Sequence, residues 1–354
     1  MKIAFTICSN NYLAQASVLV ESFKKFHQDY YFAIILVDEL SDKVDYKSIG
    51  VEEILPIAEL SQYNIQELFD KYNIVELNTA VKPFVFKYFI EKFQSIEVLY
   101  YFDPDLKFFS DIEHITQELQ VASIVLTPHI LEPIMRDGKR LNDQEFLNYG
   151  LYNLGFLGLN PQHSDIPALL NWWGDRTFHL GYDRVAKGLF VDQLWMNLAP
   201  IFYKDVYISH DRGLNMGPWN LHERRVELIE PNQQVILDNE EKLRFYHFSS
   251  FKFRDPAQLS HSDRYTIDDV GLLKQLYLDY QADVIRHRIE EYSQIRCVYI
   301  PPVVPLTGRA KVKSKVSTAL RMLAEKIKPT PLMLIVGSLI AIQVCHSGSG
   351  SIMF

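Results

Sequence analysis

Two aspartates, Asp103 and Asp105, come directly after an apolar run that ends at Phe102. The segment from Ile96 to Phe102 is rich in β-branched and aromatic residues, which predicts a buried strand. Open α/β sheets bind ligands at the carboxyl ends of their strands, so both acids should lie at such an end. Pro104 keeps Asp103 out of the helical region of backbone space, so the chain should leave the sheet extended. Two carboxylates suit Mg²⁺ or Mn²⁺, which keep water and substrate phosphate as further ligands. A solvated turn is the alternative for an Asp-x-Asp segment taken alone.

Three further segments place polar side chains in apolar surroundings. Asn153-Leu154-Gly155-Phe156 has a glycine in a strand-like run, which marks either a bulge or the close approach of a ligand or backbone. Asp192-Gln193 begins an apolar helical stretch, where an aspartate is either a helix cap or a site residue. The loop from His210 to Arg225 carries charged groups and Trp219, which suit either a sugar acceptor or a surface excursion.

A fourth segment, Tyr246 to Arg254, ends a predicted strand with an imidazole and two cations. A single histidine in an apolar frame is usually a core residue with its hydrogen bonds satisfied. The neighbouring Lys252 and Arg254 make His247 a candidate metal ligand instead.

The composition indicates an ordinary globular protein: of 354 residues, 48% are hydrophobic and 23% are charged. A net charge of −8 argues against binding to nucleic acid. Three cysteines are too few and too scattered for a disulfide framework, which indicates a reducing compartment. Met1 to Cys8 fits a first strand rather than a signal peptide, so we expect a cytoplasmic protein.

The elements that must position these residues alternate between strand and helix, which predicts an α/β fold with a mostly parallel, Rossmann-like sheet flanked by helices. The first βα turn, Cys8 to Tyr12, has no glycine and is therefore neither a dinucleotide fingerprint nor a P-loop. The predicted strands are Ile3–Cys8, Phe32–Val37, Ile96–Phe102, Val121–Thr127, Phe156–Leu159 and Leu243–Phe248. The predicted helices are Tyr12–Phe26, Thr79–Phe93, Leu169–Phe178, Asp192–Phe202 and Ile267–Tyr292.

The segment from Pro301 onward has a different character. Its prolines predict a linker, and Arg309 to Lys328 carries a net charge of +6, which leaves −14 for the rest of the chain. The apolar run from Leu332 to Val344 is shorter than the roughly 20 residues that span a bilayer. Residues 309–344 therefore suit either a segment that lies on an anionic membrane surface or a helix that docks on the protein or on a second copy of it.

Taken together, four motifs resemble the glycogenin-like family 8 glycosyltransferases. The string Tyr101-Phe102-Asp103-Pro104-Asp105, followed by Phe108 and Asp111-Ile112, resembles the family's Asp-x-Asp segment. Asn153-x-Gly155, Asp192-Gln193 and His247-Phe248 resemble its Asn-x-Gly strand, Asp-Gln helix start and late His-Phe, in the family's order. The resemblance covers about residues 1 to 256.

The resemblance implies a GT-A fold over residues 1–256, followed by a helical extension over 257–300 and the tail over 301–354. It implies transfer of a sugar from a UDP-sugar with retention at the anomeric carbon. The acceptor would be a glycan, a lipid-linked glycan or a polysaccharide precursor.

The resemblance also implies roles for single residues. Asp103, Asp105 and His247 would hold Mn²⁺ or Mg²⁺ against the diphosphate, and the mixed ligand set suits Mn²⁺ somewhat better. Asn153, Asp192 and Gln193 would face the donor sugar. The remaining donor-binding candidates are Thr6, Cys8, Tyr12, Lys82, Phe102 and Lys252.

In this sequence Ser250 and Phe253 stand where the family has glycine and lysine. Lys252 and Arg254 flank Phe253, and either cation or neither could contact the phosphate there.

Three alternatives stay open from the sequence. An inverting GT-A transferase would need a carboxylate base, for which Asp211 or Glu223 could serve. A nucleotidyltransferase would be expected to show a glycine-rich basic loop after the first strand, which Ser9-Asn10-Asn11 is not. A non-catalytic sugar-binding or membrane scaffold protein would have acids that hold no metal.

Overall fold

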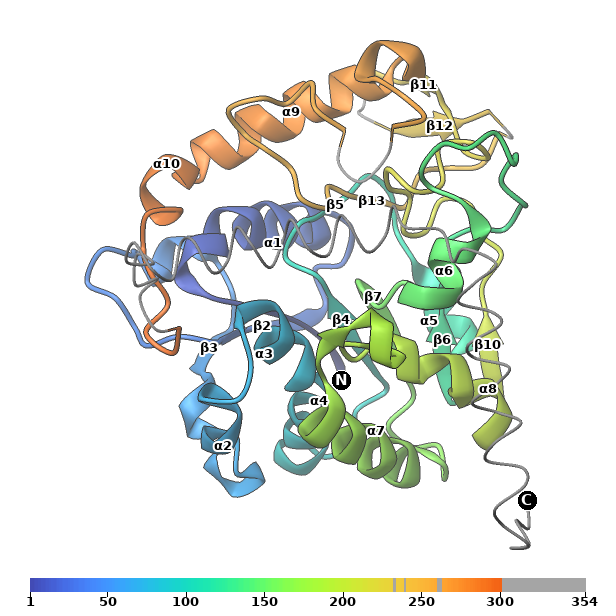
Figure 1. The fold of residues 1–354 in the computed structure, drawn as a ribbon. Coiled ribbons are helices and arrows are strands. Elements are labelled where there is room, and N and C mark those ends of the chain that lie inside the picture. Colours follow the sequence, from blue (N-terminus) through green and yellow to red (C-terminus); the bar gives the residue numbers. More distant parts are fainter. Residues whose placement is uncertain (232–233, 239, 260–262, 301–354) are drawn as a thin grey trace, which may run out of the picture. The chain divides into compact units, whose positions relative to one another are not determined.

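A seven-stranded sheet forms the centre of the protein, with strand order β10-β6-β7-β4-β1-β2-β3 (Figure 1). The computed structural model describes residues 1–231, 234–238, 240–259 and 263–300. The strands of this sheet are β1 (Lys2–Cys8), β2 (Tyr30–Leu36), β3 (Glu53–Pro56), β4 (Val98–Phe102), β6 (Ile124–Leu126), β7 (Phe156–Leu159) and β10 (Val206–Ile208).

Most neighbours in the sheet run parallel, and β7 is the exception. The pairs β1–β2, β1–β4, β2–β3 and β6–β10 are parallel, whereas β7 runs antiparallel to both β4 and β6. Phe102 pairs with Phe156, so the carboxyl end of β4 lies beside the amino end of β7. The predicted mostly parallel α/β sheet is confirmed.

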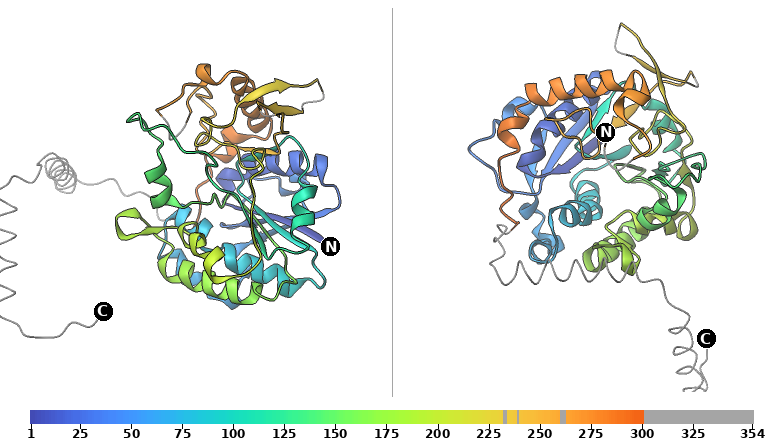
Figure 2. Two further views of the ribbon diagram at one scale, coloured as in Figure 1. Left: turned by 90° about the vertical axis from the view of Figure 1, so that its right-hand side faces the viewer. Right: turned by 45° about the horizontal axis from the view of Figure 1, so that its top comes forward.

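Helices cover both faces of the sheet, because successive side chains of its buried strands point to opposite faces and both sets are apolar. Helices α1 and α9 lie on one face, and α3, α4 and α7 lie on the other (Figures 1 and 2). The helices are α1 (Leu13–Phe26), α2 (Gln66–Phe69), α3 (Ile74–Ala80), α4 (Lys82–Lys92), α5 (Glu113–Glu118), α6 (Asp143–Tyr149), α7 (Ile166–Leu180), α8 (Ala199–Phe202), α9 (Leu273–Arg286) and α10 (Ile289–Tyr292).

The described residues also form three small two-stranded sheets. They pair β5 (Leu106–Phe108) with β13 (Phe245–His247), β8 (Asp183–Arg184) with β9 (Leu189–Phe190), and β11 (Val226–Ile229) with β12 (Val235–Leu237). The first of these matters for the site, because His247 lies directly opposite Leu106, the residue after Asp105.

Two predicted helices are divided in the structure. The stretch predicted as Ile267–Tyr292 consists of a 3₁₀ turn (Ile267–Val270), α9 and α10, because Gly271 and Arg288 have positive φ angles of 58° and 67° that interrupt helical geometry. The stretch predicted as Thr79–Phe93 lies across the end of α3 and all of α4, with Pro83 in the first turn of α4, where its missing N–H costs nothing.

The stretch Asp192–Phe202 is not one helix beginning at Asp192. The φ angle of Val191 is 40°, a short 3₁₀ helix spans Leu194–Leu198, and α8 follows. Asp192 is buried and does not cap this segment. The alternative in which it is a helix cap is therefore wrong.

Residues 1–300 form one compact unit. The predicted linker, basic segment and apolar run of residues 301–354 lie outside the described residues. Among the described helices, none is long and apolar enough to cross a membrane.

Candidate active site

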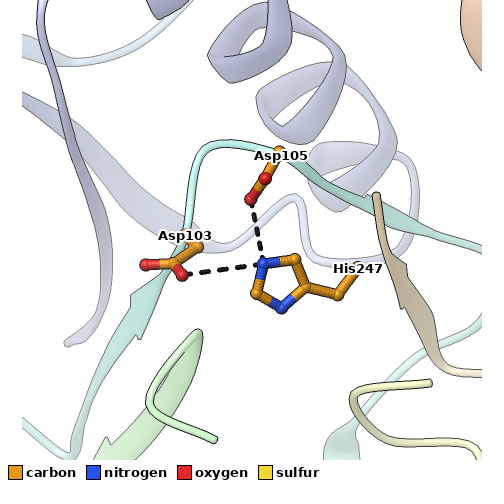
Figure 3. A group of neighbouring side chains, drawn as sticks. All are labelled: Asp103, Asp105 and His247. Carbon is orange, nitrogen blue, oxygen red and sulfur yellow. Dashed lines mark ion pairs between the residues drawn. The ribbon is translucent and has the colours of Figure 1, made fainter. Parts of the chain in front are cut away.

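Asp103, Asp105 and His247 converge on one point although they come from two distant parts of the chain (Figure 3). His247 Nε2 lies 3.1 Å from Asp105 Oδ1 and 3.7 Å from Asp103 Oδ2. One ligand atom from each residue lies within 4.8 Å of the others. The expected grouping of these three side chains is present.

The main chain determines this convergence. Asp103 follows β4, and its backbone N–H donates to the carbonyl oxygen of Gly155 at 2.7 Å, which ties the first acid to the chain leading into β7. Phe248 N–H donates to the carbonyl oxygen of Asp105 at 3.0 Å, which ties the second acid to the end of β13. The antiparallel pairing of β5 with β13 thus brings His247 beside the acids.

Gly155 provides the space that the imidazole needs. A Cβ atom at this position would lie 2.4 Å from Cε1 of His247 and 2.7 Å from Nδ1, closer than non-bonded atoms approach. The glycine predicted to mark close approach of a ligand or backbone therefore lies against a side chain of the site itself.

The two acids also determine the charge on His247. Burial disfavours the charged imidazole, but Asp105 and then Asp103 outweigh that effect and raise the pKa of His247 above the ordinary histidine value. A divalent cation competes with this proton, because only neutral imidazole has a lone pair to donate.

Lys82 links the half-buried acids to a buried carboxylate, that of Asp192. Its ammonium lies 3.0 Å from Asp192 Oδ2 and 3.7 Å from Asp103 Oδ1, and it donates to the carbonyl oxygen of Leu154 at 3.0 Å. Lys82 comes from the first turn of α4 and is 3% exposed, while Asp192 is 1% exposed. Burial raises the pKa of Asp192, and Lys82 opposes that shift.

Two predicted site residues, Asn153 and Gln193, have side-chain amides that form hydrogen bonds with backbone groups of the protein. Asn153 Oδ1 accepts from the backbone N–H of Gly155 at 2.8 Å. Gln193 accepts from Leu154 N–H at 3.0 Å and donates to the carbonyl oxygen of Tyr149 at 2.8 Å. Both amides therefore stabilise the segment that enters β7.

The residues predicted to bind the nucleoside differ in how accessible they are. Thr6 and Cys8 are buried at the end of β1, and Phe102 is buried in the aromatic core beneath the acids. Tyr12 is 40% exposed. Partial burial, followed by the charges of Asp105 and Asp103, raises the pKa of Tyr12.

Lys252 and Glu223, which lies in the loop from His210 to Arg225, form contacts away from the group of Asp103, Asp105 and His247. Lys252 is exposed and donates to Gln258 at 2.7 Å. Glu223 accepts from the backbone N–H groups of Leu131 and Glu132 and pairs with the buried Arg224 at 2.9 Å. This part of the loop holds the neighbouring segment in place.

Two site residues were not identified as such in the sequence. Tyr101 donates a short hydrogen bond from its hydroxyl to Asp103 Oδ1, and Lys82 lies 4.3 Å from the centre of its ring. Asn215 lies 3.2 Å from His247 Nδ1. Alternation along β4 could have indicated Tyr101, since residues two apart share a face of a strand. No local signal distinguishes Asn215 within its loop.

The side chains fit a divalent metal ion. Two carboxylates and one imidazole converge with their donor atoms close together, and Gly155 leaves room for the ring. This mixture of oxygen and nitrogen donors suits Mn²⁺ better than Ca²⁺, which prefers an all-oxygen shell.

The chain is similar in sequence to two bacterial proteins whose activity is not stated. No protein-family model matches the chain. The uncharacterized protein YfnF of Bacillus subtilis (strain 168) is 24% identical over 285 residues, which cover 80% of this chain and 92% of YfnF. The uncharacterized protein YfnD of the same strain is 24% identical over 293 residues, which cover 79% of this chain and 88% of YfnD.

The similar solved structures are glycosyltransferases. This is the class of enzyme whose motifs the four motifs of this chain resemble. The galactosyltransferase LgtC, solved with donor and acceptor sugar analogues, is 14% identical with a TM-score of 0.43, and the match covers 80% of this chain and 95% of LgtC. Mouse xyloside xylosyltransferase 1 is 16% identical with a TM-score of 0.43, over 71% of this chain and 98% of that protein. The glycosyltransferase GlyE of Streptococcus pneumoniae TIGR4 is 11% identical with a TM-score of 0.43, over 83% of this chain and 65% of GlyE. Similarities of this size do not identify an activity, so the side chains described above must indicate the function.

Proposed function

We propose that this protein is a metal-dependent glycosyltransferase. It would move a sugar from a UDP-sugar to a glycan, lipid-linked or polysaccharide acceptor, with retention at the anomeric carbon. The observation that carries the proposal is the Asp103, Asp105 and His247 group, with the buried Lys82–Asp192 pair beside it.

The chemistry of sugar transfer from a nucleotide suits this arrangement. Negative charge grows on the diphosphate as its bond to the anomeric carbon breaks, and a bound divalent ion supplies positive charge that stabilises it. Asp103, Asp105 and His247 would hold that ion. Lys82 places a second positive charge at the same edge of the sheet, and its contact with Asp192 keeps the ammonium in a defined position.

The retaining assignment depends on Asp192, Gln193 and Asn153. Asp192 is the buried carboxylate closest to Lys82 and is proposed to face the reacting carbon, with Asn153 near the donor sugar. Retention is tested by following the anomeric configuration of the product by NMR, and an inverted product would overturn this part of the proposal.

The two carboxylates named as candidate bases for an inverting enzyme, Asp211 and Glu223, already have partners. Asp211 pairs with His114 at 2.9 Å and with Arg244 at 3.2 Å, and it accepts from Gly213 N–H at 2.7 Å. Glu223 is buried against Arg224 and two backbone donors. Neither is placed as a free general base, which supports retention.

Metal-dependent cleavage of a panel of UDP- and GDP-sugars tests the activity. We expect Mn²⁺-dependent release of UDP by the wild-type protein, and a fall of more than about 100-fold for Asp103→Asn or Asp105→Asn, because losing a direct ligand should cost more than losing a residue that only orients one. The neutral amide keeps the size of the carboxylate, so the variants should remain folded.

A surface carboxylate provides the matched control. Asp268 is exposed and pairs only with Lys274 among the ion pairs of the described residues, so Asp268→Asn should retain full activity. Unchanged activity of the Asp103 and Asp105 variants, or of wild type in excess chelator, would contradict the metal assignment.

A non-catalytic sugar-binding protein is the second candidate, since the same acids could bind a nucleotide without turnover. UDP with Mn²⁺ should raise the melting temperature in either case, because a ligand that binds only the native state stabilises it. Raised stability with no release of UDP from any donor would favour the binding protein.

A further inference from the structure

We propose that Asn215 is a positioning residue that fixes the ring orientation and tautomer of His247, so that Nε2 points toward Asp103 and Asp105. The proposal rests on the metal site proposed above. It assigns a role to a residue in the His210–Arg225 loop, which the sequence left as either an acceptor site or a surface excursion.

The backbone places Asn215 beside His247 independently of its side chain. The N–H of His247 donates to the carbonyl oxygen of Met216 at 2.7 Å, and Arg244 N–H donates to that of Gly213 at 2.8 Å. The loop therefore runs along β13 and is fixed by main-chain hydrogen bonds. Asn215 is 0% exposed, and its φ angle of 54° is one that asparagine tolerates better than most residues.

The orientation of the Asn215 amide follows from its neighbours. The nitrogen Nδ2 lies 3.2 Å from the carbonyl oxygen of Asn153, which can only accept a hydrogen bond. It also lies 3.0 Å from Thr127 Oγ1 and 3.2 Å from Asn153 Oδ1. Asn153 Oδ1 accepts from Gly155 N–H, so that atom is an oxygen too. The Nδ2 group is thus surrounded by acceptors, and Oδ1 must be the atom that faces His247.

This orientation determines the tautomer of the imidazole. Asn215 Oδ1 lies 3.2 Å from His247 Nδ1 and can only accept, so Nδ1 must carry the hydrogen. Nε2, which lies 3.1 Å from Asp105 Oδ1, is then the nitrogen that gives up its hydrogen and offers a lone pair when a metal ion binds beside the acids. A metal-ligating histidine is commonly held in this way by an acceptor at its other nitrogen.

The same contacts form a chain of hydrogen bonds that runs from Asp103 to His247. Asp103 N–H donates to Gly155, Gly155 N–H donates to Asn153 Oδ1, and Asn215 Nδ2 donates to the same oxygen. Asn215 then accepts from His247, whose Nε2 faces Asp103 again. A change at Asn215 should therefore affect the metal ligands before it affects the rest of the fold.

The test measures Mn²⁺ affinity by calorimetry in the presence of UDP for two variants. Asn215→Gly removes the amide and accommodates the positive φ angle, so the fold should persist. We expect a loss of about 10- to 100-fold in Mn²⁺ affinity, the range for residues that orient metal ligands. Asn215→Asp keeps an oxygen acceptor for Nδ1 and should retain affinity within a few-fold, even if it lowers stability through the lost contacts of Nδ2.

A direct readout of the ring separates positioning from a purely structural role. With Mg²⁺ and UDP bound, the ¹⁵N chemical shifts of His247 should report a protonated Nδ1 in wild type and in Asn215→Asp. In Asn215→Gly the Nδ1 hydrogen has no amide acceptor, so its ¹H signal should move upfield and exchange faster with water. An unchanged Nδ1–H signal in Asn215→Gly, or unchanged Mn²⁺ affinity, overturns the proposal.

Asn220 is the matched control. It is also 0% exposed and lies in the same loop, but within the described part of the chain its amide binds only main-chain groups, those of Gly217, His129 and Asn215. Asn220→Ala should lower the melting temperature but change Mn²⁺ affinity less than Asn215→Gly does. An equal loss of Mn²⁺ affinity in both variants would contradict the proposal, because it would show that any loosening of the loop weakens metal binding. If wild type itself binds no Mn²⁺, the proposed metal site fails, whereas normal binding by both wild type and Asn215→Gly refutes only the role of Asn215.

Discussion

The group formed by Asp103, Asp105 and His247 depends on one residue that has no side chain. Gly155 lies against the ring of His247 and donates its N–H to Asn153, so it shapes the site through space and through its backbone. A methyl group at this position must displace the imidazole, because Phe102 and Phe156 hold the surrounding strands in register.

Gly155→Ala tests this close approach. We expect Mn²⁺ affinity to fall by at least about 10-fold, as for loss of an orienting contact, and stability to fall by about 1–3 kcal/mol, as for overpacking of a core. Calorimetric metal titration and urea unfolding measure the two effects.

Gly174→Ala is the control for this substitution. The Cβ atom added there, in α7, would lie 3.4 Å from Phe84, an ordinary contact, so metal binding should be unchanged. Wild-type metal affinity in Gly155→Ala would show that the ring has room to shift without loss.

At the scale of elements, helix α9 supports the strand that carries His247. Tyr280 stacks on Phe248 with ring centroids 3.8 Å apart and an interplanar angle of 2°. The hydroxyls of Tyr277 and Tyr246 lie 3.1 Å apart. The segment expected to be an extension beyond the catalytic region thus packs directly against both neighbours of His247 in the chain.

Two substitutions at Tyr280 separate packing from hydrogen bonding. Tyr280→Ala should destabilise the protein by about 3–5 kcal/mol, the usual cost of removing a buried aromatic ring. Within the described residues, the hydroxyl of Tyr280 is buried without a hydrogen-bond partner, so Tyr280→Phe should be neutral or stabilising by about 1 kcal/mol. Urea unfolding measures both, and marked destabilisation by Tyr280→Phe would show that the hydroxyl has a partner, such as a bound water.

At the scale of the whole molecule, two buried histidines make stability depend on pH. Burial lowers the pKa of His27 to about 4 and that of His129 to about 3. Both are neutral in the folded protein above those values, whereas an unfolded chain protonates them below about pH 6.5. Between pH 6.5 and about 4 the unfolded state therefore binds more protons, and each histidine lowers the free energy of unfolding by about 1.4 kcal/mol per pH unit as the pH falls.

His27→Phe isolates one of these contributions. The ring of His27 packs against Phe23, Tyr30 and Phe108, so phenylalanine should fit. Loss of the acceptor for Ile112 N–H gives a destabilisation that does not change with pH. The slope of unfolding free energy against pH should nevertheless fall by about 1.4 kcal/mol per unit between pH 6.5 and 4.5. Equal slopes for wild type and His27→Phe would show that His27 is protonated in the folded state.

Much of the fold could be predicted because its signals are local. Buried runs such as Phe32–Val37 and Ile96–Phe102 identified central strands, since strands covered on both faces must be apolar throughout. Element ends were less predictable. The break at Arg288 has no local signal, because its φ angle of 67° is one that arginine seldom adopts.

The sequence by itself indicated which residues are candidates for the chemistry, because the candidate ligands follow apolar strands whatever those strands pair with. Asp103 and Asp105 end one such strand, and His247 ends another.

Only the tertiary structure decided how these residues meet. The reversal of β7 places Gly155 beside the acids, and the pairing of β13 with β5 brings in His247 from far along the chain. Packing of α4 against the site joins Lys82 to Asp192. Strand direction and pairing depend on how residues distant in sequence bury apolar surface together. A local sequence pattern therefore does not identify the strand with which a given strand will pair.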